Sequence, residues 1–182
     1  MLPNMQSLLD AIKWADEGHA GQTRRGSGLP YITHPIAVSY IVAAFKRSKR
    51  LVELLIVAIL HDVLEDTGRD FEEIARRYGP FVASLAYELK NDDEEIARVG
   101  KLEYQTRKVL GISSYALVVK LADRLHNISD QPTKNMVRDT LVLMSRLRAG
   151  RKLSKTQKAM VAEIERLCHE KQAGWATHAV AT

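Results

Sequence analysis

The chain has 182 residues, of which 46% are hydrophobic and 27% charged, and this composition is typical of a single globular domain. Its formal charge of +5 suits an anionic ligand but does not by itself establish nucleic-acid binding. No apolar run reaches the roughly 18–20 residues of a membrane span, the N-terminus lacks the pattern of a signal peptide, and the single cysteine, Cys168, excludes an internal disulfide. We therefore expect a cytoplasmic protein with no membrane partner.

The first quarter of the chain predicts two helices joined by a loop. Residues 5–18 carry apolar residues at helical spacing. Residues 20–33 contain three glycines, a proline and two adjacent arginines, a composition that predicts a loop, which we call the arginine loop. His34 and Pro35 then open a predicted helix that runs to about Phe45. Because the residue before a proline is pushed out of helical geometry, we expect His34 at the mouth of this helix, either as a packed or capping residue or as a ligand.

The segment Leu51–Thr67, LVELLIVAILHDVLEDT, carries the strongest functional signal. Its first half is apolar on almost every side, which predicts a buried helix. Its second half places His61, Asp62, Glu65 and Asp66 at separations of three and four residues, which bring side chains onto one helix face. Because buried charge is costly unless it is paired or binds a metal, this segment predicts a site.

The rest of the chain is also predicted to be helical. Further helices are expected over residues 71–78, from Pro80 to about Lys90, from Glu95 to about Leu110, over 115–128, over 133–149 and over 154–171. We assign residues 1–172 to one domain and expect 173–182 to form a disordered tail. No segment shows the alternation of a strand, so the sequence predicts an all-α fold of about eight to ten helices.

The predicted helix over residues 115–128 is the second buried one. Lys120, Asp123 and Asn127 share one of its faces by their spacing. An aspartate inside a buried helix demands a partner, and either a salt bridge to a basic residue or a metal ion satisfies that demand. A different feature follows between Arg146 and Lys158, where six lysines and arginines gather. These are interpreted either as a solvated surface or as a docking face for an anionic partner.

Two histidines and two aspartates from these segments form a candidate metal centre. They are His34, His61, Asp62 and Asp123. Mixed nitrogen and oxygen ligands suit Mn²⁺ or Fe²⁺, and also Zn²⁺. The absence of thiolates sets the group apart from a typical structural zinc site. A divalent ion in such a site lowers the pKa of bound water and polarises a phosphoryl oxygen.

Charged residues near the candidate centre suggest how it is used. Glu65 and Asp66 could position the attacking water or move a proton, although surface carboxylates near a helix end are the alternative interpretation. An anionic substrate must also be drawn towards a site that is rich in carboxylates. Arg24, Arg25 and Lys120 are the basic residues that could do this.

Taken together, the motifs HPIAV, AILHDVLEDT and VVKLADRLHNI resemble the HD-domain hydrolases of guanosine tetraphosphate and pentaphosphate. These are the hydrolase part of the Rel/SpoT enzymes of the stringent response and the small alarmone hydrolases, including the metazoan SpoT homologue type. The arginine loop and the His34-Pro35 pair after it, together AGQTRRGSGLPYITHP, also resemble that family. This loop separates the family from other HD proteins. The resemblance covers about residues 8–130.

The resemblance implies a function and assigns roles in that function to residues of this chain. One Mn²⁺ would bind His34, His61, Asp62 and Asp123. Glu65 and Asp66 would form the catalytic diad. The guanine nucleotide would contact Arg24, Arg25 and Asn127. The implied reaction is hydrolysis of the 3′-pyrophosphate to give GDP or GTP plus pyrophosphate, in a single HD-domain bundle without synthetase activity.

Two departures from the family pattern leave other functions open. The arginine loop is one residue longer than in the bacterial bifunctional enzymes, through residues 26–28, and residues 88–92 replace a threonine-containing segment that lies near the substrate in relatives. One alternative is an HD phosphohydrolase for another nucleotide, such as a nucleoside monophosphate or NADPH. Another is a non-enzymatic nucleotide-sensing or nucleic-acid-binding module that uses the basic residues 146–158, although nucleic acid is not the expected partner. The sequence leaves the oligomeric state open.

Overall fold

The computed structural model describes residues 4–180, and within them the only β-type pairing is an isolated bridge between Thr23 and Pro30. The helices in this part are α1 (Met5–Gly18), α2 (Thr33–Phe45), α3 (Leu51–Leu60), α4 (Val63–Asp66), α5 (Phe71–Tyr78), α6 (Pro80–Leu89), α7 (Asp93–Val99), α8 (Lys101–Gly111), α9 (Ser114–Ser129), α10 (Lys134–Gly150) and α11 (Lys155–Val180). The all-α prediction is confirmed. No helix within residues 4–180 combines the length and apolar character needed to cross a membrane.

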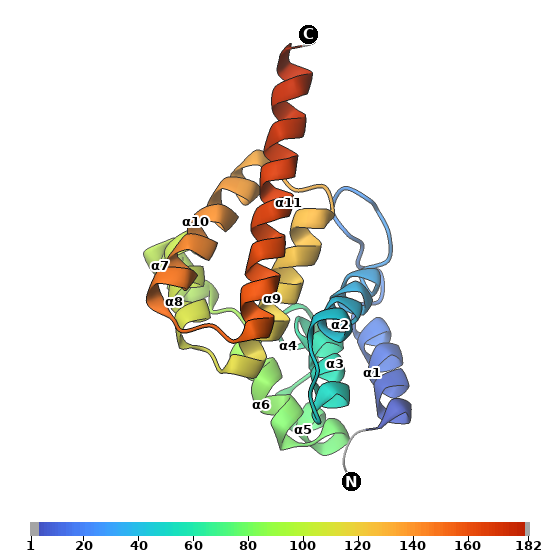
Figure 1. Cartoon of the computed structure of the whole chain (residues 1–182). Coiled ribbons are helices and arrows are strands. Elements are labelled where there is room, and N and C mark those ends of the chain that lie inside the picture. The colour runs from blue at the N-terminus through green and yellow to red at the C-terminus, as the bar shows by residue number, and fades with distance from the viewer. Residues whose placement is uncertain (1–3, 181–182) are drawn as a thin grey trace.

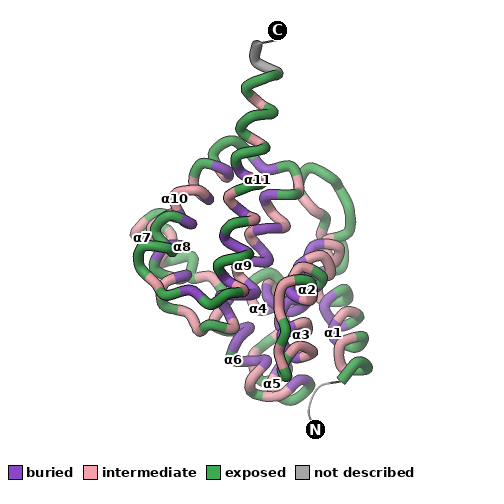
Figure 2. Tube along the Cα trace, viewed as in Figure 1, coloured by how far each residue is buried: buried purple, intermediate pink, exposed green. Residues whose placement is uncertain are grey.

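Two helices, α3 and α9, form the centre of the domain (Figure 1). α3 packs against α1, α2, α6 and α9, while α9 packs also against α2, α10 and α11. Residues 56–60 of α3 are fully buried, as its almost unbroken apolar sequence predicts. Figure 2 shows the buried positions along α9 and the adjoining part of α11, whereas the end of α11 that projects beyond the domain is largely exposed.

The long central helix predicted over residues 51–67 is divided into α3 and α4 by a turn at His61 and Asp62. His61 Nδ1 donates to the Ala58 carbonyl oxygen at 2.8 Å. In a continuous helix that oxygen would accept the Asp62 N–H, so the histidine side chain replaces a backbone hydrogen bond at this point. His61 and Asp62 still lie close to Glu65 and Asp66, as predicted, because both turn residues keep nearly helical backbone angles.

Two other predicted boundaries also differ. The helix expected from Glu95 to about Leu110 is divided into α7 and α8 by Gly100, whose φ of 85° lies in the left-handed region that favours glycine. At the C-terminus, α11 continues to Val180 instead of ending near Lys171. Gly174 is the one poor helix former in its last turns, and a single glycine in a helix is tolerated. Residues 181–182 of the predicted tail lie outside the described residues.

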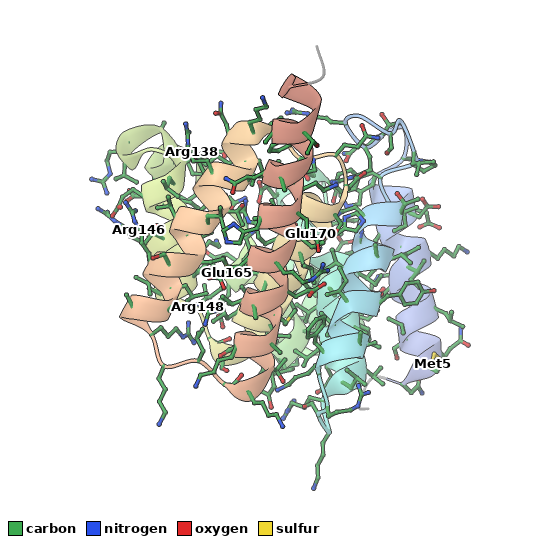
Figure 3. The ribbon with its side chains drawn as sticks, turned by 45° about the horizontal axis from the view of Figure 1, so that its top comes forward. Met5, Arg138, Arg146, Arg148, Glu165 and Glu170 are labelled. Carbon is green, nitrogen blue, oxygen red and sulfur yellow. The ribbon has the colours of Figure 1, made fainter. Side chains whose placement is uncertain are left out.

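The basic residues 146–158 take part in helix packing. Arg151 donates to the carbonyl oxygens of Val109 and Ile112 at the end of α8, at 3.0 and 2.6 Å. Arg148 of α10 faces Glu165 of α11, with two hydrogen bonds of 3.0 and 2.6 Å (Figure 3). These contacts connect α10 to α8 and α11 and favour a structural role for this part of the basic stretch.

We expect Gly100→Ala to destabilise the fold by about 1–3 kcal/mol, because an alanine resists the backbone angles at this break. The measurement is the urea midpoint of unfolding followed by circular dichroism. Gly174→Ala is the matched control, since Gly174 is helical and has open space around it, and its midpoint should be unchanged or higher. Equal midpoints for wild type and Gly100→Ala would show that α7 and α8 can adjust to an alanine.

Candidate active site

His61 lies in the turn after α3 and is 2% exposed. Its Nδ1 must carry the proton because it donates to the Ala58 carbonyl oxygen, and Nε2 is therefore directed away from that bond. Nε2 lies 3.0 Å from Asp62 Oδ2 without the alignment of a hydrogen bond and is a buried atom with no hydrogen-bond partner. A buried, unpartnered imidazole nitrogen beside carboxylates is the arrangement that a metal ligand requires.

The charge around His61 also favours a cation. Burial lowers the pKa of the His61 imidazole, but the carboxylates of Asp62 and Asp123 outweigh burial and raise the pKa to about 9. The carboxylates thus create a negative potential at Nε2, which attracts a proton in the absence of any other cation. The same potential would stabilise a divalent ion at that position.

His34 occupies the first turn of α2, at the predicted helix mouth, and is 1% exposed. Its Nε2 lies 3.3 Å from Asp123 Oδ1 and 3.8 Å from Asp62 Oδ2. Its Nδ1 lies 2.8 Å from Nδ1 of His126, so one ring donates to the other. Burial is the main reason that the pKa of His34 is lowered, which favours the neutral ring that a metal needs.

Asp123 is the buried carboxylate of the group and projects from α9. Lys120 Nζ lies 3.2 Å from its Oδ2, and Asn127 Nδ2 donates to its Oδ1 at 2.6 Å. Burial opposes ionisation of Asp123, but Lys120 and the two imidazoles His34 and His61 outweigh it and hold the pKa of this carboxyl well below its usual range. Asp123 is thus an ionised carboxylate with a fixed orientation.

Three of the four predicted metal ligands form one compact group. Ligand atoms of His34, His61 and Asp123 all lie within 4.8 Å of one another. Asp62 stands beside this group and accepts a hydrogen bond of 2.6 Å from the Tyr31 hydroxyl. Two imidazole nitrogens, one of them the orphaned Nε2 of His61, and a buried carboxylate fit a divalent cation, which His34, His61 and Asp123 could hold with Asp62 adjacent.

The predicted catalytic carboxylates lie on α4 at the edge of the same cleft. Glu65 accepts two hydrogen bonds of 3.0 Å from Asn91, one from the backbone N–H and one from the side-chain amide. Burial, followed by the charges of Asp62 and Glu65, raises the pKa of Asp66. The two carboxylates are therefore in different environments, which suits different roles in proton transfer.

The predicted substrate-binding residues also converge on this cleft, which has a volume of about 570 Å³. Its lining includes Arg24, Arg25, Lys120 and Asn127. Arg24 is anchored by Asp130, which accepts from its Nε and Nη2 at 3.2 Å, and by Asn127, whose Oδ1 accepts from Nη2 at 2.8 Å. Because Asn127 also donates to Asp123, a continuous chain of hydrogen bonds connects the arginine loop to the candidate metal centre.

Sequence reasoning missed three side chains of the site. His126 follows Asp123 by three residues, and Tyr31 precedes His34 by three, so helical spacing and proximity to the loop motif could have indicated them. The third, Asn91, lies in the linker between α6 and α7, within the segment 88–92 that the resemblance places near the substrate in relatives, but its contact with Glu65 was not predicted. Asn91 is 26 residues from Glu65 in the chain, and no local helical spacing signals that contact.

Comparison with known proteins identifies the family. Residues 11–154 match the HD domain. The chain belongs to the HD-domain family. This HD domain is 34% identical over 161 residues to the bifunctional (p)ppGpp synthase/hydrolase SpoT of Escherichia coli, a match that covers 79% of the chain but 21% of that relative. The chain therefore spans about a fifth of the length of its bacterial relatives.

Relatives of similar size are also found. The HD domain is 35% identical over 124 residues to the guanosine-3′,5′-bis(diphosphate) 3′-pyrophosphohydrolase MESH1 of Danio rerio, and the match covers 68% of each chain. A solved structure of a metazoan orthologue of SpoT, described as hydrolysing ppGpp, superposes with a TM-score of 0.73 at 26% identity. That superposition covers 91% of this chain and 97% of the other. The likeness thus extends over nearly the whole fold.

We expect His126→Ala to weaken binding of a divalent cation by about 10–100-fold, because the partner that orients the His34 ring is removed. The measurement is isothermal titration of the metal-free protein with Mn²⁺. His169→Ala, a change at an exposed position of α11, should leave the affinity unchanged. Unchanged affinity in His126→Ala would show that His34 does not need this partner to bind the ion.

Proposed function

We propose that this HD domain hydrolyses the 3′-pyrophosphate of guanosine tetraphosphate and pentaphosphate, releasing GDP or GTP and pyrophosphate. The observation that carries the proposal is the convergence, in one cleft, of the His34–His61–Asp123 group, the carboxylates of Glu65 and Asp66, and the basic arginine loop. The similarity to MESH1 over 68% of both chains supports the same reaction. We place the activity in the cytoplasm, with no synthetase activity in this domain.

The proposed ligands of a single Mn²⁺ are His34, His61, Asp62 and Asp123. The imidazoles of His34 and His61 present Nε2 to the site, and Asp123 adds a buried carboxylate. When bound, the ion supplies Lewis acidity towards phosphoryl oxygens and makes water more acidic. Mn²⁺ suits this mixed donor set, and Fe²⁺ and Zn²⁺ are the competing ions.

The reaction requires two proton transfers, and Glu65 and Asp66 are the residues that we assign to them. Water attacks the phosphorus bonded to O3′, the O3′–P bond breaks, and the leaving O3′ takes up a proton. We assign Glu65 to accept the proton of the attacking water, because Asn91 holds its carboxylate in the cleft. We assign Asp66 to donate the proton to O3′, because it lines the same cleft and its pKa is raised, mainly by burial.

Basic residues neutralise the substrate. We assign Arg24, Arg25, Lys120 and Asn127 to contact the nucleotide. Arg25 is exposed in the arginine loop, whereas Arg24 is anchored with its guanidinium lining the cleft. Lys120 offsets the charge of Asp123 beside the position of the phosphates. This distribution allows a highly anionic nucleotide to approach a site that is rich in carboxylates.

Product analysis tests the reaction. The protein is stripped of metal, reloaded with Mn²⁺, and offered ppGpp, GTP, NADPH and a nucleoside monophosphate in parallel. We expect GDP and intact pyrophosphate from ppGpp alone, with activity lost in Asp123→Ala and retained in Asp16→Ala, a change at an exposed position of α1. Orthophosphate from another nucleotide would identify a different HD phosphohydrolase. No turnover with metal bound would indicate a binding module.

Arg24→Ala tests the substrate class. We expect kcat/KM for ppGpp to fall at least about tenfold, because the variant loses a guanidinium that lines the cleft. Hydrolysis of p-nitrophenyl phosphate, which has no guanine nucleotide, should change much less. Arg76→Ala, at an exposed position of α5, is the control. Equal losses on both substrates in Arg24→Ala would contradict recognition of a guanine nucleotide by this residue.

A further inference from the structure

Glu65 is held by a single residue of the linker between α6 and α7. Asn91 donates its backbone N–H to Glu65 Oε2 and its side-chain Nδ2 to Glu65 Oε1, both at 3.0 Å. Both carboxylate oxygens are therefore occupied by donors from the same residue. A glutamate at an exposed position normally samples several rotamers, and two donors from one residue restrict it to one.

The linker itself is anchored on both sides of Asn91. Tyr104 of α8 is buried, and its hydroxyl oxygen accepts a hydrogen bond of 2.8 Å from the Asp92 N–H. Lys108, one turn further along α8, donates to the Lys90 carbonyl oxygen and to the Tyr104 hydroxyl oxygen. Three consecutive linker residues are thus bound by side chains of other elements, and α8 supports the middle one from both neighbours.

We propose that Asn91 is a positioning residue, which holds the Glu65 carboxylate at the angle needed for proton transfer, and that Tyr104 and Lys108 fix Asn91 for this purpose. The inference rests on the catalytic role given to Glu65 in the proposed function. Orientation of a reacting group before the reaction removes part of the entropic cost of the transition state. Asn91 thereby connects α8, which contributes none of the proposed catalytic side chains, to the chemistry on α4.

The hydrogen bonds of Asn91 distinguish positioning of Glu65 from simple anchoring of the linker. The side-chain amide of Asn91 reaches Glu65, whereas Tyr104 and Lys108 hold the backbone of its neighbours. The chemistry of the amide matters as well, because a neutral N–H donor matches a carboxylate. An aspartate of the same shape would set two carboxylates against each other.

Steady-state kinetics with ppGpp tests the proposal. Asn91→Ala removes the amide but keeps the backbone donor, and we expect kcat to fall about tenfold, the effect of one charge-assisted hydrogen bond. KM should change less than about twofold and Mn²⁺ affinity should be unchanged, because the substrate and metal residues are intact. Asn91→Asp should lower kcat further. Asn135→Ala, at an exposed position of α10, is the control.

A double-mutant cycle distinguishes positioning from structure. In a Glu65→Gln background, Asn91→Ala should not lower the single-turnover rate constant of hydrolysis any further, because Asn91 acts only through Glu65. Tyr104→Phe keeps the packing of the ring and replaces Asn91→Ala in the cycle if that variant does not fold. It should slow hydrolysis when Glu65 is present and have no effect in the Glu65→Gln background. If Asn91→Ala slows hydrolysis by the same factor with Glu65 and with Glu65→Gln, the positioning role is wrong, whereas the catalytic assignment of Glu65 stands. Wild-type kcat in Glu65→Gln overturns the catalytic assignment of Glu65 and the inference with it.

Discussion

The burial of ionisable groups between α2, α3 and α9 is the constraint on which this structure depends. Two histidines and an aspartate lie in the core, and their charged forms are costly there unless they are compensated. Compensation comes from within the group, because Lys120 and the imidazoles keep Asp123 ionised while the carboxylates raise the pKa of His61. The nitrogen and oxygen donors that this compensation holds close together suit a divalent cation.

Each member of the group is oriented by a second contact outside it. The Ala58 carbonyl fixes the His61 ring, His126 fixes the His34 ring, and Asn127 fixes Asp123. The first of these contacts also ends α3, so the same hydrogen bond shapes the helix and selects the tautomer of the His61 imidazole. Orienting contacts of this type generally determine metal affinity as strongly as the ligands themselves.

The rest of the cleft is built on connections that extend from this group. The hydrogen bonds from Asp123 through Asn127 to Arg24 join the arginine loop to the core, and Tyr31 joins the loop to Asp62. On the opposite side, α8 supports the linker that holds Glu65. The arginine loop, the buried His/Asp group and the carboxylates of α4 therefore come from different secondary-structure elements and converge on one cleft.

The sequence by itself determined the fold class, most helix boundaries, the two buried helices and the chemical types of the site residues. These follow from local periodicity and from the cost of burying charge, both of which a linear pattern contains. The His34, His61 and Asp123 donors were named on the same grounds, and the family resemblance agrees with the HD-domain match.

Only the tertiary structure decided which of these residues meet. It turned Asp62 towards Tyr31, placed His126 against His34, brought Asn91 to Glu65 and directed Arg151 onto the end of α8. It also divided helices at His61 and Gly100, where one side-chain hydrogen bond and one backbone angle outweighed continuous helical patterns. Such contacts join residues that are far apart in the chain, and they depend on how helices pack and on side-chain rotamers, which sequence periodicity does not specify.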